Sequence, residues 1–246
     1  GSDTVTITST ATAVKNVTAD GTEKNNTFSY VLSNADGYQT PETEYGTLTV
    51  TARPITITGT TIEDAIPYDG VEHSVEAYTY NEGTAETEEG LLPTDAITPA
   101  TVKEAGTNVA KYTQDIQGTD FTITKGEGED AEDVTANYAI TKVDGGFEII
   151  KNEKTLKITS GTQSWVYNGE EHTYEVYTVV YGDSTVTGTE GQKVFTLDGS
   201  DTVTITSTAT AVKNVTAEGT EKNNTFSYVL SNADGYQTPE TEYGTL

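Results

Sequence analysis

Apolar residues alternate with threonine and other polar residues along most of this chain, which is the two-residue period of a half-buried β-strand. Residues 3–14 (DTVTITSTATAV) are the clearest case, because Val5 and Ile7 alternate with threonine. Further strands are expected at residues 27–33, 73–80, 111–117, 120–124, 137–143, 146–151, 155–159, 172–181 and 193–197. Residues 93–103 could hold one helical turn, but no segment sustains a 3.6-residue period.

The longest strand-like run covers residues 46–59 (GTLTVTARPITITG). We predict two strands here, joined at Arg53 and Pro54, because proline has no N–H to give to a sheet ladder. Turn signals separate the short strands at intervals of roughly 8 to 12 residues. This spacing predicts an all-β protein, with a β-sandwich or β-grasp-like sheet and little or no helix.

Two internal repeats organise the chain. Residues 1–48 and 199–246 are identical except that Asp20 is replaced by Glu218, which gives 47 identities in 48 at an offset of 198. A fainter repeat relates residues 68–78 (YDGVEHSVEAY) to residues 167–177 (YNGEEHTYEVY) at an offset of 99. The chain therefore reads as tandem modules of about 99 residues: module A at 50–151, module B at 152–246, and the C-terminal half of a preceding B-type module at 1–49. We expect residues 1–48 to pack less completely than residues 199–246, or to take strands from a neighbouring chain.

Charge and composition exclude several classes of function. The net charge of −26 over 246 residues repels nucleic acid and anionic lipid, so neither is an expected partner. No stretch approaches 18 consecutive apolar residues, so no membrane insertion is expected. The absence of cysteine excludes disulfides and thiolate metal sites.

The repeated turn supplies the main candidate site, a structural motif made of Tyr68, Asp69, Gly70 and His73 in module A and of Tyr167, Asn168, Gly169 and His172 in module B. A histidine repeated once per module could bind a metal or sense pH, or it could be a structural side chain beside the turn. One histidine per module without a second histidine or cysteine makes a poor transition-metal site, so the structural interpretation is favoured.

An acidic segment at residues 126–133 is the second candidate. Hard cations bind several carboxylate oxygens, so this segment could hold calcium. The candidate ligands are Glu127, Glu129, Asp130, Glu132 and Asp133. The spacing of a helix-loop-helix calcium loop is missing, and a solvated acidic loop is favoured. No other cofactor is expected.

Tyrosines cluster near the predicted strands, at Tyr78, Tyr80, Tyr174, Tyr177 and Tyr181. They could form a platform on which a sugar stacks, but alternation along a strand would send about half of them into the core. The sequence contains no recognisable serine–histidine–aspartate order or paired catalytic carboxylates, so we do not expect an enzyme.

The turns at residues 68–70 (YDG) and 167–169 (YNG), the strand at 137–140 (NYAI) and the segment at 46–50 (GTLTV) together carry a family resemblance. They resemble the YDG/MBG-type tandem repeats of bacterial cell-surface adhesins. Residues 145–149 match the closing segment loosely, and module B departs from the pattern with residues 234–236 (DGY).

The resemblance implies an extracellular, wall-anchored protein of a bacterial surface, without catalytic residues. The expected role is that of a stalk or spacer, whose partners are neighbouring repeats and which projects a distal binding domain. The alternative is that each repeat binds a host glycan, mucin or immunoglobulin.

Overall fold

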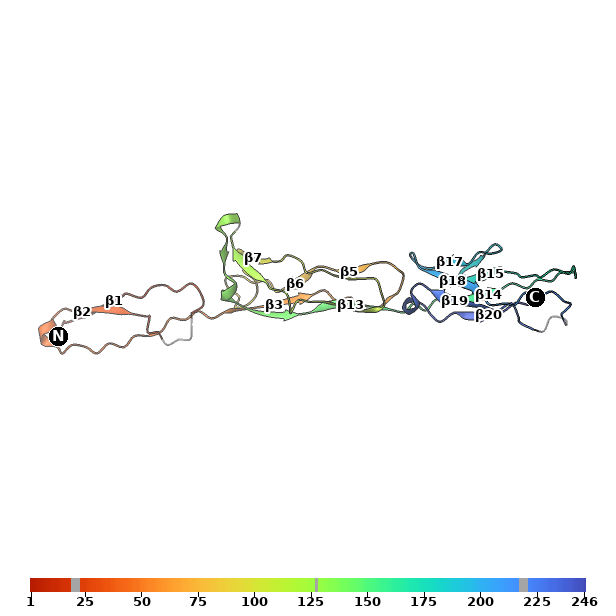
Figure 1. Cartoon of the computed structure of the whole chain (residues 1–246). Coiled ribbons are helices and arrows are strands. Elements are labelled where there is room, and N and C mark those ends of the chain that lie inside the picture. The colour runs from red at the N-terminus through yellow and green to blue at the C-terminus, as the bar shows by residue number, and fades with distance from the viewer. Residues whose placement is uncertain (19–22, 127, 217–220) are drawn as a thin grey trace. The chain divides into compact units, whose positions relative to one another are not determined.

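The computed structural model describes residues 1–18, 23–126, 128–216 and 221–246, and it shows an all-β protein (Figure 1). Strands hold 40% of the residues and helical turns 5%, which confirms the predicted fold class. The helical turns are short 3₁₀ segments: η1 (Ala35–Gly37), η2 (Gly128–Asp130), η3 (Thr135–Asn137) and η4 (Ala233–Gly235). No helix within these described ranges is long and apolar enough to cross a membrane.

The chain divides into two compact units, each assembled from several segments. Unit 1 comprises residues 1–59, 77–102 and 116–144, and unit 2 comprises residues 60–76, 103–115 and 145–246. The sequence of module A is therefore divided between the two units.

Unit 1 contains three sheets. The first pairs β1 (Val5–Ser9) with β2 (Phe28–Leu32). The second has the order β12 (Tyr138–Val143), β3 (Arg53–Gly59) and β6 (Tyr78–Tyr80), with β12 parallel to β3. The third has the order β11 (Glu132–Asp133), β10 (Thr122–Lys125) and β7 (Asp95–Thr98). Ile55 and Ile57 of β3 pack with Ile123 of β10 and Phe121, so a core lies between the second and third sheets.

Unit 2 contains four sheets. Two small ones consist of β4 (Ile66–Pro67), β13 (Gly145–Ile150) and β9 (Ala110–Gln114), and of β5 (His73–Val75) with β8 (Glu104–Gly106). A four-stranded sheet has the order β16 (Ser184–Thr187), β15 (Tyr177–Tyr181), β14 (Leu156–Ser160) and β20 (Glu240–Glu242). The last has the order β17 (Val194–Thr196), β18 (Thr202–Ser207) and β19 (Phe226–Leu230).

The main core of unit 2 lies between its two larger sheets. Ile158 of β14 and Tyr177 of β15 pack with Val203 and Ile205 of β18, and all four are fully buried. These residues alternate with exposed or half-buried ones along their strands, as the two-residue period predicts.

The prediction of two strands across residues 46–59 is wrong in two respects. Residues 47–52 form no strand, because the backbone of Leu48 and Val50 bonds to the side chains of Asn25 and Thr18 instead of a ladder. Arg53 and Pro54 are not a linker but the first residues of β3. The proline is accommodated because β6 pairs only with residues 57–59, which leaves β12 as the sole strand neighbour of Pro54 within the described sheet.

Two other sequence predictions are also corrected. Residues 93–103, where a helical turn was considered, instead contain the strand β7. The single strand predicted at residues 73–80 is two strands, β5 and β6, which belong to different sheets. An alternating pattern is the same for one continuous strand and for two consecutive strands that belong to different sheets.

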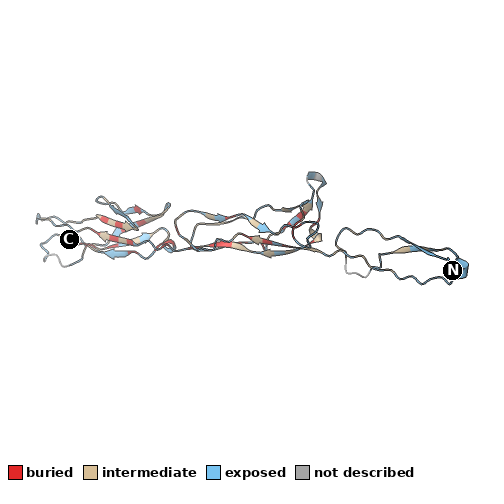
Figure 2. Ribbon diagram, turned by 180° about the vertical axis from the view of Figure 1, so that it is seen from behind, coloured by how far each residue is buried: buried red, intermediate tan, exposed pale blue. Residues whose placement is uncertain are grey.

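The two copies of the 48-residue repeat have the same local fold. The β1–β2 pair and the β18–β19 pair share one register, so that Ile7 lies opposite Tyr30 and Ile205 opposite Tyr228. Their surroundings differ: Val5 and Ile7 are 56% and 64% exposed, whereas Val203 and Ile205 are 0% exposed. Figure 2 shows the same contrast, since the strands nearest the N-terminus carry no buried residue. Residues 1–48 therefore pack less completely than residues 199–246, as the repeat predicts.

This pair of copies provides a matched test of burial. Ile205→Ala should lower the free energy of unfolding by about 2–5 kcal/mol, because it removes a fully buried side chain. Ile7→Ala, the same change in the same local sequence, should cost less than about 1 kcal/mol. The measurement is guanidinium unfolding followed by far-ultraviolet circular dichroism, which reports on the strands of both units, because Ile7 lies in unit 1 and Ile205 in unit 2. Equal losses in the two variants would contradict the assignment of the core.

Candidate functional site: a tyrosine junction in unit 2

The Tyr-Asp-Gly and Tyr-Asn-Gly turns have the same internal geometry. Asp69 Oδ1 accepts from the Val71 N–H at 2.9 Å and lies 3.1 Å from His73 Nε2. Asn168 Oδ1 likewise accepts from the Glu170 N–H at 2.9 Å and lies 2.9 Å from His172 Nε2. Each histidine therefore contacts the second residue of its own turn.

The glycine of each turn is required by the backbone. Gly70 has φ +73° and Gly169 has φ +80°, in the left-handed region that other residues rarely adopt. Burial would raise the pKa of the Asp69 carboxyl, but the hydrogen bond from Val71 and the contact with His73 outweigh it and lower this pKa. The sequence motif thus encodes a compact turn that presents its tyrosine at a fixed position.

The two tyrosines of the repeated turns end in opposite environments. Tyr68 is only 3% exposed, whereas Tyr167 is 62% exposed. The Tyr68 hydroxyl donates to Asp201 Oδ2 at 2.5 Å and accepts from Asn232 Nδ2 at 2.8 Å. Both partners belong to the repeat block at 199–246, so the turn of module A is bound by module B.

Aromatic contacts hold the Tyr68 ring. Its centroid lies 5.5 Å from that of Tyr236 in an edge-to-face arrangement, and Tyr236 makes a second such contact with Tyr181 at 5.7 Å. A Cβ atom at Gly235 would lie 2.4 Å from the Tyr68 ring, so only glycine leaves room for the side chain at this point. We call the set of Tyr181, Asp201, Asn232, Gly235 and Tyr236 the B socket.

Asp201 connects the hydroxyl groups of the B socket. The Tyr236 hydroxyl donates to Asp201 Oδ2 at 3.0 Å, and the Ser231 hydroxyl donates to Oδ1 at 3.0 Å. One carboxylate therefore accepts from three hydroxyls, two of them on buried tyrosines. Such charge-assisted bonds are stronger than neutral ones, and each partner would be costly to leave unpaired in a buried site.

A second polar network lies beside the socket. Asn152 is buried, and its Nδ2 donates to the Tyr68 carbonyl at 3.1 Å and to the Tyr181 hydroxyl at 2.8 Å. The Tyr181 hydroxyl in turn donates to Asp198, which also pairs with Lys154 Nζ at 2.9 Å. The main chain at Tyr68 is thus anchored independently of its side chain.

The surroundings change the acidity of the junction tyrosines. Burial, followed by the hydrogen bond to Asp201, raises the pKa of Tyr68 to about 12. Burial also raises the pKa of Tyr181, with a contribution from Asp198, and the pKa of Tyr236, with a contribution from Asp201. All three hydroxyls therefore stay protonated and can donate throughout the neutral range.

The exposed turn of module B has a different environment. The Trp165 ring stacks on the His172 ring, with centroids 4.8 Å apart and an interplanar angle of 12°. These rings and Tyr167 line an open cleft of 230 Å³, which Lys213, Asn214 and Val215 also border. The cleft is lined by both polar and apolar side chains, and Tyr167, which borders it, is exposed.

The acidic candidates do not gather into a cation site among the residues that the structure describes. No group of three or more His, Asp or Glu side chains in that part of the chain could hold a metal ion. Glu132 pairs with Lys15 at 3.3 Å, and Asp133 accepts from the Thr135 N–H at 2.9 Å. Asp130 is exposed at the end of η2; Glu127 and the Glu129 side chain lie outside what the structure describes.

Most of the clustered tyrosines face other side chains. Tyr177 is fully buried, and Tyr78 makes an edge-to-face contact with Phe121 at 5.4 Å between centroids. Tyr174 and Tyr181 are half-buried, and Tyr80 is exposed. Four of the five are therefore at least half-buried.

Sequence reasoning identified Tyr68 but missed its partners. Asp201 and Asn232 lie inside the repeated block, where nothing distinguishes them from their exposed counterparts Asp3 and Asn34. In the sequence, Gly235 and Tyr236 stand out only as a departure from the family pattern. The spatial meeting of residues 68 and 201 leaves no trace in local periodicity.

Comparison of the chain with protein-family models, with curated proteins and with solved structures found no match. The contacts of the tyrosine junction are therefore the basis for a proposed function.

The junction should make stability sensitive to alkaline pH. Below pH 10 both folded and unfolded chains keep Tyr68 protonated, and its contribution is fully present. Between pH 10 and about 12 the unfolded chain releases this proton while the folded chain retains it, so stability falls as pH rises.

The measurement is the guanidinium midpoint of the Trp165 fluorescence transition at pH values from 8 to 12. Tyr68→Phe should make the alkaline fall less steep, whereas Tyr167→Phe should keep the slope of the original chain because Tyr167 is exposed. Parallel falls in all three proteins would contradict the assigned role of Tyr68.

Proposed function

We propose that this chain is a structural repeat region, a stalk or spacer, of a bacterial surface adhesin of the YDG/MBG type. The observation that carries the proposal is the burial of the Tyr68 turn in the B socket. The turn recurs at an offset of 99 residues, and its first copy binds the following module, which is how a connector fixes where one module ends and the next begins. In such an array each module contacts its neighbours, and stability adds up along the chain.

The charge of the chain agrees with this role. A net charge of −26 opposes collapse of the chain onto itself and non-specific association with other acidic surfaces. The junction tyrosines Tyr68, Tyr181 and Tyr236 all donate their hydroxyl groups to Asp198 or Asp201, in the contacts that form the junction between modules A and B. The proposed action is mechanical: the repeats set the distance between the cell and a distal binding domain.

A second candidate function has one specific observation in its favour. The Trp165–His172 stack and the exposed Tyr167 border an open cleft, and aromatic faces of this kind can stack on sugar rings. Under this alternative each B-type repeat binds a host glycan. The cleft at Trp165, Tyr167 and His172 would then bind a sugar and not another protein module.

Small-angle X-ray scattering tests the stalk. A single compact domain of this length has a radius of gyration of roughly 18 Å. We expect a value well above that figure, because tandem modules that contact only their neighbours form an extended chain. A value near that of the compact domain would contradict the spacer role.

A glycan array with the same protein separates the two candidates. Saturable binding that Tyr167→Ala abolishes, and that Tyr80→Ala on another exposed tyrosine leaves unchanged, would favour the binding function. The stalk predicts no such binding.

A further inference from the structure

We propose that residues 1–48, together with a cavity beside Asp95 and Tyr138, form a docking surface for a second copy of residues 152–198. The occupant brings its strands to the uncovered sheet and inserts its Tyr167 into the cavity. The inference deepens the proposed array by naming the contact that joins a B-type module to module A. It rests on residues of unit 1 and on the duplicate block, which shows how the same sequence is covered.

The duplicate block identifies the covered face. Val203, Ile205 and Phe226 are buried in the second copy, and the counterparts Val5, Ile7 and Phe28 are exposed or half-buried in the first. Val31 and Val229 serve as an internal reference, because they are 68% and 69% exposed in the two copies. The two copies therefore differ in burial on the face that carries Val5, Ile7 and Phe28, and not on the face that carries Val31.

Residues 152–198 are what cover that face in the second copy. Leu156, Ile158, Tyr177, Val179 and Phe195 supply the apolar side chains that pack on Val203 and Ile205. Strand β17 pairs with β18, and β14 pairs with β20.

Polar contacts fix the register of this cover. Ser160 Oγ donates to the Asn224 carbonyl at 2.5 Å, and Asn224 Nδ2 donates to the Gly161 carbonyl at 2.8 Å. Lys157 Nζ pairs with Glu242 at 2.8 Å. Asn26 and Glu44 stand at the equivalent positions of the first copy, so the same segment finds the same polar partners there.

Residues 1–48 already make internal contacts that residues 199–246 also make beneath their cover. The Tyr38 hydroxyl donates to Asp3 Oδ2 at 3.1 Å, as Tyr236 does to Asp201 at 3.0 Å. The Phe28–Tyr45 edge contact also matches the Phe226–Tyr243 contact, with centroids 5.4 Å and 5.1 Å apart. The surface is thus formed without its cover, which lowers the cost of docking.

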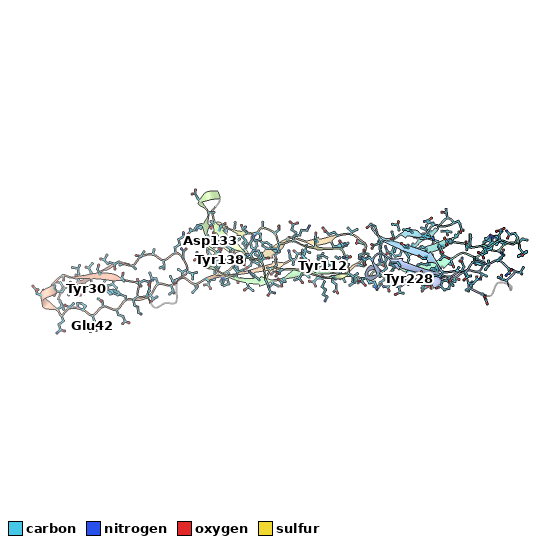
Figure 3. All side chains as sticks on the ribbon, viewed as in Figure 1. Tyr30, Glu42, Tyr112, Asp133, Tyr138 and Tyr228 are labelled. Carbon is cyan, nitrogen blue, oxygen red and sulfur yellow. The ribbon has the colours of Figure 1, made fainter. Side chains whose placement is uncertain are left out.

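The cavity in unit 1 resembles the B socket. The Tyr138 hydroxyl donates to Asp95 Oδ2 at 2.7 Å, as Tyr236 does to Asp201 (Tyr138 is labelled in Figure 3). The two aspartates have similar positions on their strands. Asp95 is the first residue of β7, which pairs antiparallel with β10. Asp201 directly precedes β18, which pairs antiparallel with β19. A cavity of 370 Å³ opens beside this pair, bordered also by Leu92, Val134 and residues 15–17.

The repeat places Tyr167 at this cavity. In the second copy Tyr167 shares its cleft with Lys213, Asn214 and Val215. The counterparts of these three residues, at an offset of 198, are Lys15, Asn16 and Val17, which border the cavity in unit 1. A segment seated on residues 1–48 as residues 152–198 sit on 199–246 therefore carries its tyrosine to Asp95 and Tyr138.

The precedent for insertion is Tyr68. It shows that a tyrosine of this turn is buried when an aspartate–tyrosine pair of the next module is available. The Val17 N–H already donates to Asn137 Oδ1 at 2.8 Å, so the rim of the cavity is fixed against η3. We therefore call the set of Leu92, Asp95, Val134 and Tyr138 the A socket.

The test extends the full chain with a second copy of residues 152–198 placed directly before Gly1. This order repeats the natural join between Asp198 and Gly199. The original copy carries Trp165→Phe, so that tryptophan fluorescence reports on the added segment alone. The added tryptophan should unfold cooperatively in guanidinium, and amide exchange in peptides covering residues 91–98 and 134–143 should slow at least tenfold.

Variants of the added copy separate the two parts of the surface. Tyr167→Ala should restore fast exchange at residues 91–98 and 134–143 while the cooperative tryptophan transition persists. Thr173→Ala, at an exposed position, should change neither readout. Ile158→Asp should abolish the transition, because the matching isoleucine is fully buried in the second copy.

Three results would overturn the proposal. One is an added segment whose tryptophan shows no cooperative transition, and another is unchanged exchange at both peptides. The third is a saturable glycan ligand of the unextended chain that still binds the extended one and needs Tyr167, since that assigns the tyrosine face to sugar. Unchanged exchange together with an extended scattering profile would refute the docking surface and leave the stalk in place.

Discussion

The carboxylate of Asp201 is the group on which the junction depends. It accepts hydroxyl donors from Tyr68 and Tyr236, which come from opposite sides of the contact between modules A and B. Asp201 is half-buried, whereas Tyr68 and Tyr236 are buried, and a buried hydroxyl left without an acceptor costs about 1–3 kcal/mol. The contact between modules A and B is therefore favourable only in the arrangement that pairs these groups. This gives the two modules a defined point of contact at the junction.

The duplicated block isolates what packing adds to a sequence. The β1–β2 and β18–β19 pairs have the same register, and each copy has the same bond between two threonine hydroxyls, so these features follow from local sequence. Burial of Val203 and Ile205 follows from residues 152–198, which lie outside the repeated block and directly precede it. The hairpin of the block therefore keeps its register whether its apolar face is exposed, as in the first copy, or covered by residues 152–198, as in the second.

Local patterns predicted the strands but not their partners. The alternation around Ile158 and Ile205 identified β14 and β18, because one face of each is buried. Pro54 misled the prediction, since its effect depends on which side of β3 lacks a strand neighbour, and that is a property of the sheet. The turn around Gly70 was recognisable from its residues, but its binding partner was one of 39 acidic residues and carried no local signal. Long-range pairing of this kind is set by the summed packing of both modules.

A double-mutant cycle between Tyr68→Phe and Asp201→Ala tests the central claim most directly. The free energy of unfolding is measured with the Trp165 fluorescence transition for both single variants and the double variant. The account predicts a coupling energy of roughly 1–3 kcal/mol, because the two groups share a partly buried, charge-assisted hydrogen bond. Tyr167→Phe combined with Asp201→Ala should be additive to within about 0.5 kcal/mol. Additivity in the Tyr68 cycle as well would contradict the account.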